Sequence, residues 1–120
     1  MRNYRNIKAY QLADRLVVEI YKISRVFPRD ETYGLTSQLR RAAVSVPTNI
    51  AEGASRQHKK DYLQFLYVSR GSLAETGYLL ELANKICYMD EKQFNTIDTL
   101  RQDTAKTLFG LIQSVEQEIF

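Results

Sequence analysis

Residues that commonly do chemistry are scarce in this sequence, where His58 is the only histidine and Cys87 the only cysteine. A cysteine nucleophile needs a base, and no histidine accompanies Cys87, so we expect a buried, inert thiol. His58 stands among cations that disfavour a bound metal, and we expect an ordinary surface side chain. No Glu-x-x-His pair occurs, which excludes the carboxylate metal sites of helical bundles. We therefore predict no catalytic residue, no metal site, no cofactor and no enzymatic activity.

Two basic clusters carry a different kind of chemistry, the recognition of phosphate. They are Arg40-Arg41 and the run Arg56-Gln57-His58-Lys59-Lys60, with Tyr62 and Tyr67 nearby. Several cations on one surface can bind nucleic-acid phosphates, and aromatic rings can stack on unpaired bases. We predict that the contacts to RNA or DNA phosphates are Arg40, Arg56, Lys59, Lys60 and Arg70. The alternative is a solvated helix end, since no helix-turn-helix, zinc-finger or RNA-binding aromatic motif accompanies the clusters.

A polar constellation interrupts the apolar pattern in the middle of the chain. Its members recur every three or four residues and therefore share one face of a helix: Gln38, Arg41, Ser45, Asn49 and Glu52. An arginine among apolar neighbours favours a carboxylate partner, which Glu52 or Glu75 could supply. We predict a structural polar network between helices that includes Arg41, Asn49, Glu52 and Glu75. The alternative is a ligand pocket around Arg41 and Glu52.

Charge is distributed unevenly along the chain. Residues 1–70 contain 13 Lys and Arg against 6 Asp and Glu, whereas residues 71–120 contain 4 against 8. Such polarity can steer an anionic partner to one side of the molecule, or it can let opposite surfaces of identical subunits meet. The pattern leaves both alternatives open.

Four amphipathic segments must position these side chains. Apolar residues recur at spacings of three and four over residues 8–26, 33–54, 58–88 and 91–119, which predicts four helices. Pro28 ends the first helix, and Pro47 bends the second without ending it. Asp90 and Gln93 form a capping box before the fourth. Because the connections are short, we predict one all-α domain over residues 1–120, an antiparallel up-down-up-down four-helix bundle.

The sequence contains no membrane signal. No apolar stretch approaches the roughly 18–20 residues that a membrane span needs. The basic N-terminus is not followed by the apolar core of a signal peptide, because Lys8, Asp14, Arg15 and Glu19 interrupt it. We therefore expect a cytoplasmic protein with no membrane partner.

One long stretch resembles a known bacterial family. It is the run FPRDETYGLTSQLRRAAVSVPTNIAEG at residues 27–53, followed by Phe65-Leu66, Gly71-Ser72, Glu75 and Glu81-Leu82-Ala83. This pattern is similar to the four helix bundle protein family, also called the 23S rRNA-intervening-sequence protein or S23 family. The resemblance implies a four-helix bundle that assembles into a barrel-like homopentamer. It also implies kinship with accessory proteins of diversity-generating retroelements, in which a basic pentamer is thought to engage nucleic acid and a reverse transcriptase.

These observations together predict a non-enzymatic homo-oligomeric scaffold, a pentamer by the resemblance, that binds RNA or DNA electrostatically. The alternative is an adaptor that binds a protein partner, for example a reverse transcriptase or another polymerase, without touching nucleic acid. A third hypothesis is a small-molecule-binding or enzymatic bundle that uses the region of Arg41 and Glu52.

Overall fold

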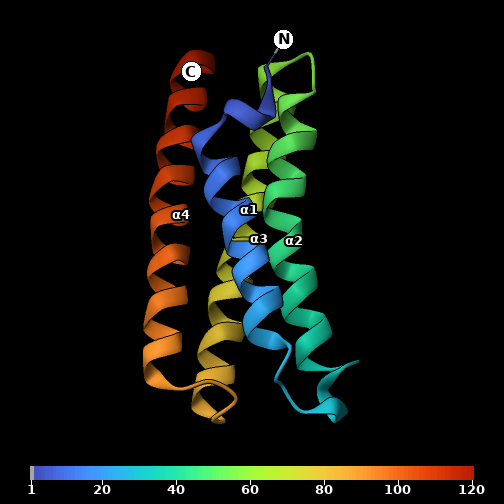
Figure 1. The fold of residues 1–120 in the computed structure, drawn as a ribbon. Coiled ribbons are helices and arrows are strands. Elements are labelled where there is room, and N and C mark those ends of the chain that lie inside the picture. The colour runs from blue at the N-terminus through green and yellow to red at the C-terminus, as the bar shows by residue number, and fades with distance from the viewer. Residues whose placement is uncertain (1) are drawn as a thin grey trace.

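The computed structural model describes residues 2–120 and consists of four long helices (Figure 1). The helices are α1 (Lys8–Ser24), α2 (Leu35–Ala54), α3 (Lys59–Lys85) and α4 (Glu91–Ile119), with short 3-10 turns at Tyr4–Asn6 and Arg29–Glu31. They run alternately up and down, and α1 and α3 each pack against both α2 and α4. No strand occurs within residues 2–120, so the prediction of an all-α antiparallel four-helix bundle is confirmed.

The bundle is 45 Å long, and its two ends differ. In Figure 1 both termini and the α2–α3 connection lie at the upper end, whereas the α1–α2 and α3–α4 connections lie at the lower end. Each end therefore gathers segments that are far apart in the sequence.

The core is made of the apolar stripes that face inward from all four helices. Fully buried side chains come from every helix, among them Leu16, Ile20, Leu39, Ile50, Leu66, Leu80 and Leu108. Burial of each such side chain contributes roughly 1.5–3 kcal/mol, which is why these helices are stable as a bundle rather than singly. Among residues 2–120, none of the helices combines the length and the apolar composition of a membrane span.

Small and polar side chains join α2 to α3. A Cβ atom at Gly53 would lie 2.7 Å from the Cβ of Phe65, so only glycine permits this approach of the two helices. Ser69 is fully buried, and its hydroxyl donates to the carbonyl of Val46 at 2.7 Å. That carbonyl precedes Pro47, and α2 continues through the proline as predicted. The contact between α2 and α3 thus combines close backbones with a hydrogen bond across the helices.

The α4 start agrees with the prediction, but the α3 end does not. The Asp90 side chain accepts from the N–H of Gln93 at 2.8 Å, and the Gln93 side chain accepts from the N–H of Asp90 at 3.0 Å.

α3 ends at Lys85, short of residue 88, because Cys87 adopts a left-handed backbone with φ 66°. The N–H of Tyr88 then donates to a carbonyl of the last turn of α3, which satisfies the helix end. The prediction of a buried Cys87 was wrong, since this turn places the thiol at the surface.

Candidate nucleic-acid interface

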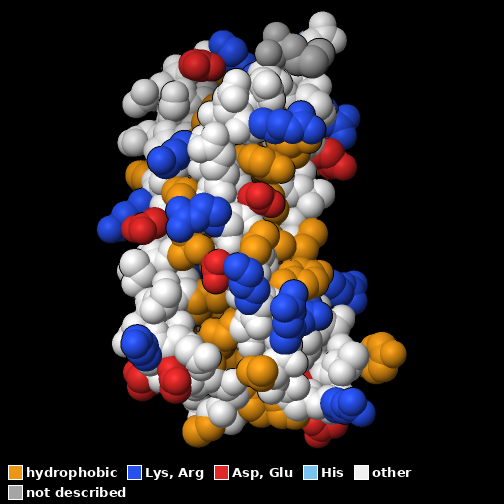
Figure 2. Space-filling view, in the orientation of Figure 1, with side chains coloured by type: hydrophobic (Ala, Val, Ile, Leu, Met, Phe, Trp, Pro, Cys, Tyr) orange, Lys and Arg blue, Asp and Glu red, His pale blue; other side chains and the backbone are white. Residues whose placement is uncertain are grey.

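The α2–α3 connection places three of the predicted phosphate contacts at the upper end of the bundle. α2 ends at Ala54 and α3 begins at Lys59, so Arg56, Lys59 and Lys60 follow one another across an exposed turn. Arg2 joins them from the N-terminal segment, and we call these four residues the upper cluster. Figure 2 shows Lys and Arg side chains over the upper parts of α1 and α2, and a second group over their lower parts.

Two cations of the upper cluster are engaged by the protein itself. Arg2 Nη1 donates to the carbonyl of Arg56 at 2.8 Å and, less closely, to that of Ala54 at 3.4 Å. This side chain therefore caps the C-terminus of α2, where carbonyl groups lack partners within the helix. Lys59 Nζ lies 3.3 Å from Glu118 Oε2 on α4. Arg2 and Lys59 therefore each contact an acceptor of the protein itself, which leaves less of their charge for a partner.

Arg56 and Lys60 are the cations that the upper cluster can offer to a partner. The Arg56 guanidinium lies 4.7 Å from the centre of the Phe65 ring, a cation–π contact that orients the charge without neutralising it. Both side chains are exposed, and neither forms a salt bridge within residues 2–120. Their contact with phosphate stays a prediction.

Arg70 and Arg40 lie away from the upper cluster. Arg70 is roughly 16 Å along α3 from Lys59, with its guanidinium 4.9 Å from the centre of the Tyr67 ring. The Tyr67 hydroxyl donates to Glu116, and this hydrogen bond raises the pKa of Tyr67. Arg40 lies roughly 21 Å below the C-terminal end of α2. The five predicted phosphate contacts therefore do not form one surface.

Arg40 instead belongs to a second basic group at the lower end, most of which was not predicted from the sequence. Arg25, Arg29 and Arg41 line the same hollow as Arg40, and Tyr33 stands beside them. The signal was present in the sequence, because two antiparallel helices bring together residues on either side of their short connection. The prediction gave weight to cations that are adjacent in sequence and overlooked those that the α1–α2 hairpin makes adjacent in space.

The polar network between α2 and α3 forms around serines. Asn49 Nδ2 donates to the carbonyl of Ser45 at 2.7 Å and to its hydroxyl at 2.9 Å. The Ser45 hydroxyl lies 2.8 Å from the hydroxyl of Ser72 on α3. Of the residues predicted for this network, the structure brings Asn49 into it.

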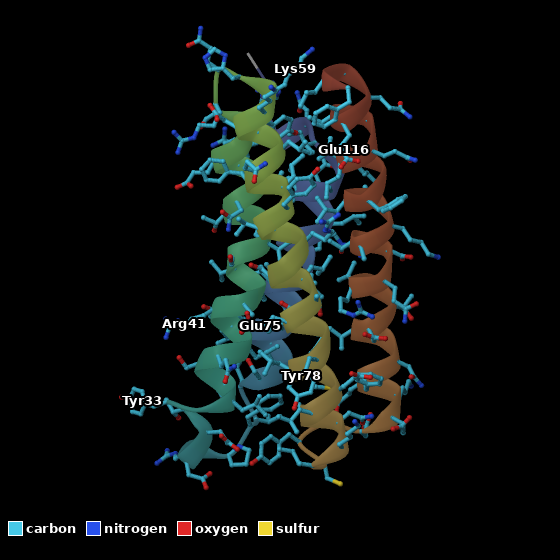
Figure 3. All side chains as sticks on the ribbon, turned by 180° about the vertical axis from the view of Figure 1, so that it is seen from behind. Tyr33, Arg41, Lys59, Glu75, Tyr78 and Glu116 are labelled. Carbon is cyan, nitrogen blue, oxygen red and sulfur yellow. The ribbon has the colours of Figure 1, made fainter. Side chains whose placement is uncertain are left out.

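Arg41, Glu52 and Glu75 lie outside this network. All three are exposed, and Figure 3 shows the Arg41 side chain pointing away from the bundle. None of them forms a salt bridge within residues 2–120, so the expected carboxylate partner of Arg41 is not found in the described part of the chain. Arg41 and Glu52 are also roughly 16 Å apart along α2, too far to line one small pocket. Within residues 2–120 these three side chains take no part in the polar network that was predicted between the helices.

The chemically reactive side chains are dispersed over the molecule. His58 is exposed at the start of α3, as predicted, whereas Cys87 lies beyond the other end of that helix. Within residues 2–120, no three His, Cys, Asp or Glu side chains converge as the ligands of a metal ion would. What the described surface does present is positive charge, exposed aromatic rings and hydroxyl groups.

Known proteins share the sequence pattern and the fold of this chain. A solved structure from Bacteroides thetaiotaomicron, at 1.70 Å resolution, is a protein of unknown function from the S23 ribosomal protein family. It is 23% identical to this chain, covers 87% of it and 97% of its own length, and superposes with a TM-score of 0.77, which shows a common fold. No curated protein matches the sequence. The family model described as 23S rRNA-intervening sequence protein matches residues 5–110, nearly the whole sequence, and the chain therefore belongs to that family.

Proposed function

We propose that this protein is a non-enzymatic scaffold that assembles with copies of itself and binds RNA or DNA through the phosphates. One observation carries the proposal: Arg56 and Lys60 are exposed, close in sequence and without a salt bridge inside residues 2–120. Phosphate binding releases counterions whatever the base sequence, so exposed cations on one surface are sufficient for it. The excess of Lys and Arg in residues 1–70, 13 against 6 Asp and Glu, supports the same interpretation.

The outer face of α3 supports self-assembly. Val68 is 53% exposed and Tyr78 58% exposed, with Gly71 and Ala74 between them at helical spacing (Tyr78 is labelled in Figure 3). A Cβ atom at Gly71 would meet nothing within 4 Å, so the backbone there is open to a neighbouring helix. Exposed apolar patches of this kind favour protein contacts. In the proposed pentamer every copy repeats the upper cluster, and weak phosphate contacts add through multivalency.

Salt-titrated binding to RNA and DNA tests the nucleic-acid part of this proposal. We expect the double variant R56E/K60E to lower affinity by about tenfold or more, and to reduce the slope of log affinity against log salt by about 2 per chain. K92E/K106E makes the same charge change on α4 and should have a much smaller effect. If both variants lose the same affinity, the effect is one of net charge and does not locate the binding surface at Arg56 and Lys60. Absence of binding by the wild type at low salt would overturn direct recognition.

The mass in solution tests the assembly. We expect about five times the chain mass of 13.9 kDa, the mass of a closed ring of five identical copies. Val68→Glu places a charge on the exposed stripe of α3 and should shift the protein towards the monomer. A monomeric wild type would contradict the proposed scaffold.

An adaptor for a protein partner, such as a reverse transcriptase, is the second candidate. The exposed Val68 and Tyr78 on α3 favour it, because they could contact a different protein as well as another copy. Recovery of a partner from nuclease-treated extract, lost in Val68→Glu while the mass in solution is unchanged, would favour the adaptor over self-assembly.

A further inference from the structure

A groove at the lower end concentrates positive charge more strongly than its sequence suggests. It is a hollow of about 390 Å³ between the last turns of α1 and the first half of α2. Its walls carry Arg25, Arg29, Arg40 and Arg41 together with Tyr21 and Tyr33, and we call it the arginine groove. No Asp or Glu of the described chain contributes to its lining. Four arginines in the lining, with no carboxylate among them, suit an anion with several negative oxygens.

The inner arginine of the groove is held in place before any ligand binds. Arg40 Nε donates to the hydroxyl of Ser24 at 2.8 Å, and its guanidinium lies 4.5 Å from the centre of the Tyr21 ring. Ser24 is 2% exposed, so this anchor is part of the packed interior. A side chain that is already ordered loses less conformational entropy on binding, which favours affinity. Arg40 thus provides a fixed charge at the wall of the groove.

The α1–α2 connection contains two carboxylates, and neither lines the groove: Asp30 is exposed, and Glu31 is directed to other partners. Glu31 Oε1 accepts from the N–H of Leu35 at 3.1 Å, and Glu31 Oε2 accepts from the hydroxyl of Tyr88 at 2.7 Å. Gly34 permits this arrangement, because a Cβ there would lie 2.7 Å from Glu31 Oε1. Both oxygens of Glu31 are therefore committed to the start of α2 and to the α3–α4 turn. The arginines of the groove keep their charge.

Tyr33 gives the groove an aromatic ring at its rim. The side chain is 97% exposed, and Figure 3 shows it projecting away from the bundle just before α2. An exposed ring beside cations is a surface on which an unpaired base can stack while its phosphates contact the arginines. Bases inside a duplex are already stacked on each other and cannot use it. The first turn of α2 also lines the groove through Thr36 and Ser37, and its partial positive charge adds to the attraction for phosphate.

We infer that the arginine groove binds single-stranded nucleic acid, with phosphates on its arginines and an unpaired base stacked on Tyr33. The inference rests on the nucleic-acid binding proposed above. It adds a second contact surface at the opposite end of the bundle and specifies the strand class. The upper cluster contacts phosphate in either strand class, whereas the arginine groove distinguishes single strands from duplexes.

The test compares a labelled single strand of about ten nucleotides with the same strand annealed to its complement, both binding to the full-length protein. We expect Tyr33→Ala to weaken single-strand binding by roughly five- to a hundredfold and to leave duplex binding unchanged. Tyr33→Phe keeps the ring and should bind as the wild type does. R25Q/R29Q should weaken single-strand binding and lower its salt slope by about 1.4. Because these side chains lie at the surface, the variants should fold, which their helical circular dichroism checks.

The outcomes separate this inference from the proposed function. If Tyr33→Ala changes single-strand and duplex binding equally, or changes neither, base stacking in the groove is wrong, whatever R56E/K60E does. If R56E/K60E has no effect while Tyr33→Ala weakens only the single strand, the groove is supported and the upper cluster fails. Polyglutamate serves as a competitor that has negative charge but no bases. If it displaces the labelled strand as strongly as unlabelled nucleic acid does, and equally from the wild type and from Tyr33→Ala, the groove is a general polyanion site and the inference is overturned.

Discussion

Each end of the bundle carries a group of basic residues, and the two groups differ in what their charges contact. At the upper end the cations are nearly consecutive in sequence, yet Arg2 caps α2 and Lys59 pairs with Glu118. At the lower end the arginines are dispersed in sequence, yet they converge on one groove with no carboxylate of the described chain in its lining. Density of charge along the chain is therefore a poor guide to the charge that a partner would meet.

The dipole of α2 accounts for much of this difference. The C-terminus of a helix carries a partial negative charge, and there Arg2 donates to the free carbonyl groups. The N-terminus carries a partial positive charge, and there Glu31 accepts from the N–H of Leu35. The two ends of α2 consequently engage Arg2 at the upper end and Glu31 at the lower end. What remains is a partly neutralised upper cluster and an uncompensated arginine groove.

Breaking the close approach of α2 and α3 should have the largest effect on stability, and it should act at the upper end. Gly53→Ala would place a methyl group 2.7 Å from the Cβ of Phe65 and 3.2 Å from the carbonyl oxygen of Tyr62. We expect a loss of about 1–3 kcal/mol in the free energy of unfolding, measured with urea, because overpacking outweighs the better helix propensity of alanine.

Gly110→Ala on α4 is the matched control, since a methyl group at this position would meet nothing within 4 Å. It should stabilise the chain by up to about 1 kcal/mol through helix propensity alone. Similar behaviour of the two variants would mean that the helices do not approach each other at Gly53 as described.

Arg40 and Arg41 are neighbours in sequence at the lower end, and their side chains differ in what they contact. Arg40→Met removes a donor to the hydroxyl of buried Ser24 and should cost about 1 kcal/mol in unfolding free energy. Arg41→Met alters a side chain that points away from the bundle and should stay within about 0.5 kcal/mol. Both variants should weaken binding of a single strand, which separates loss of charge from loss of fold. Equal stability of the two would contradict the anchored position of Arg40.

The pH dependence of the lower end tests whether Glu31 is committed to Tyr88. Their hydrogen bond lowers the pKa of Glu31 and raises the pKa of Tyr88 to about 12. The stabilisation that ionised Glu31 contributes to the folded state is present above its ordinary pKa of 4.5, and it is lost as the pH falls through the lowered pKa of the folded state. The stabilisation that protonated Tyr88 contributes to the folded state is present below its ordinary pKa of 10.0, and it is lost as the pH rises towards 12.

We therefore expect Tyr88→Phe to be less stable than the wild type near neutral pH, with the difference shrinking in acid and in strong alkali. Urea unfolding over a pH series measures this difference. Tyr33→Phe, which changes an exposed ring with no such partner in residues 2–120, should show a flat difference. A flat profile for Tyr88→Phe as well would mean that Glu31 is free to enter the arginine groove.

Much of the fold could be predicted because it depends on local patterns. Apolar spacing placed the four helices within three residues of their observed ends. The capping box of Asp90 and Gln93 was predicted from two residues three apart, and it forms. The left-handed turn at Cys87 was missed because a cysteine, unlike a glycine, carries no preference for that conformation.

The candidate sites were predicted less well, because residue types alone do not show which side chains of different turns and helices lie together. Arg40 was grouped with Arg56 and Lys59 as a phosphate contact, and it lies at the other end of the molecule, bonded to Ser24. Arg41 was expected to pair with Glu52 or Glu75, and no such pair forms within residues 2–120. Arg25, Arg29 and Tyr33 were not predicted as site residues, since only the α1–α2 hairpin brings them beside Arg40.

Helix positions, caps and family membership could thus be read from the amino-acid sequence, because they depend on residues within one or two helical turns or on a continuous motif. The availability of each charge was decided by tertiary structure. Arg40 meets Ser24 across 16 positions, Arg2 meets Arg56 across 54, and Glu31 meets Tyr88 across 57. A cation attracts an anionic partner more weakly when a carboxylate or a helix C-terminus of its own protein lies close to it. Those distances are set by packing of the helices rather than by order along the chain.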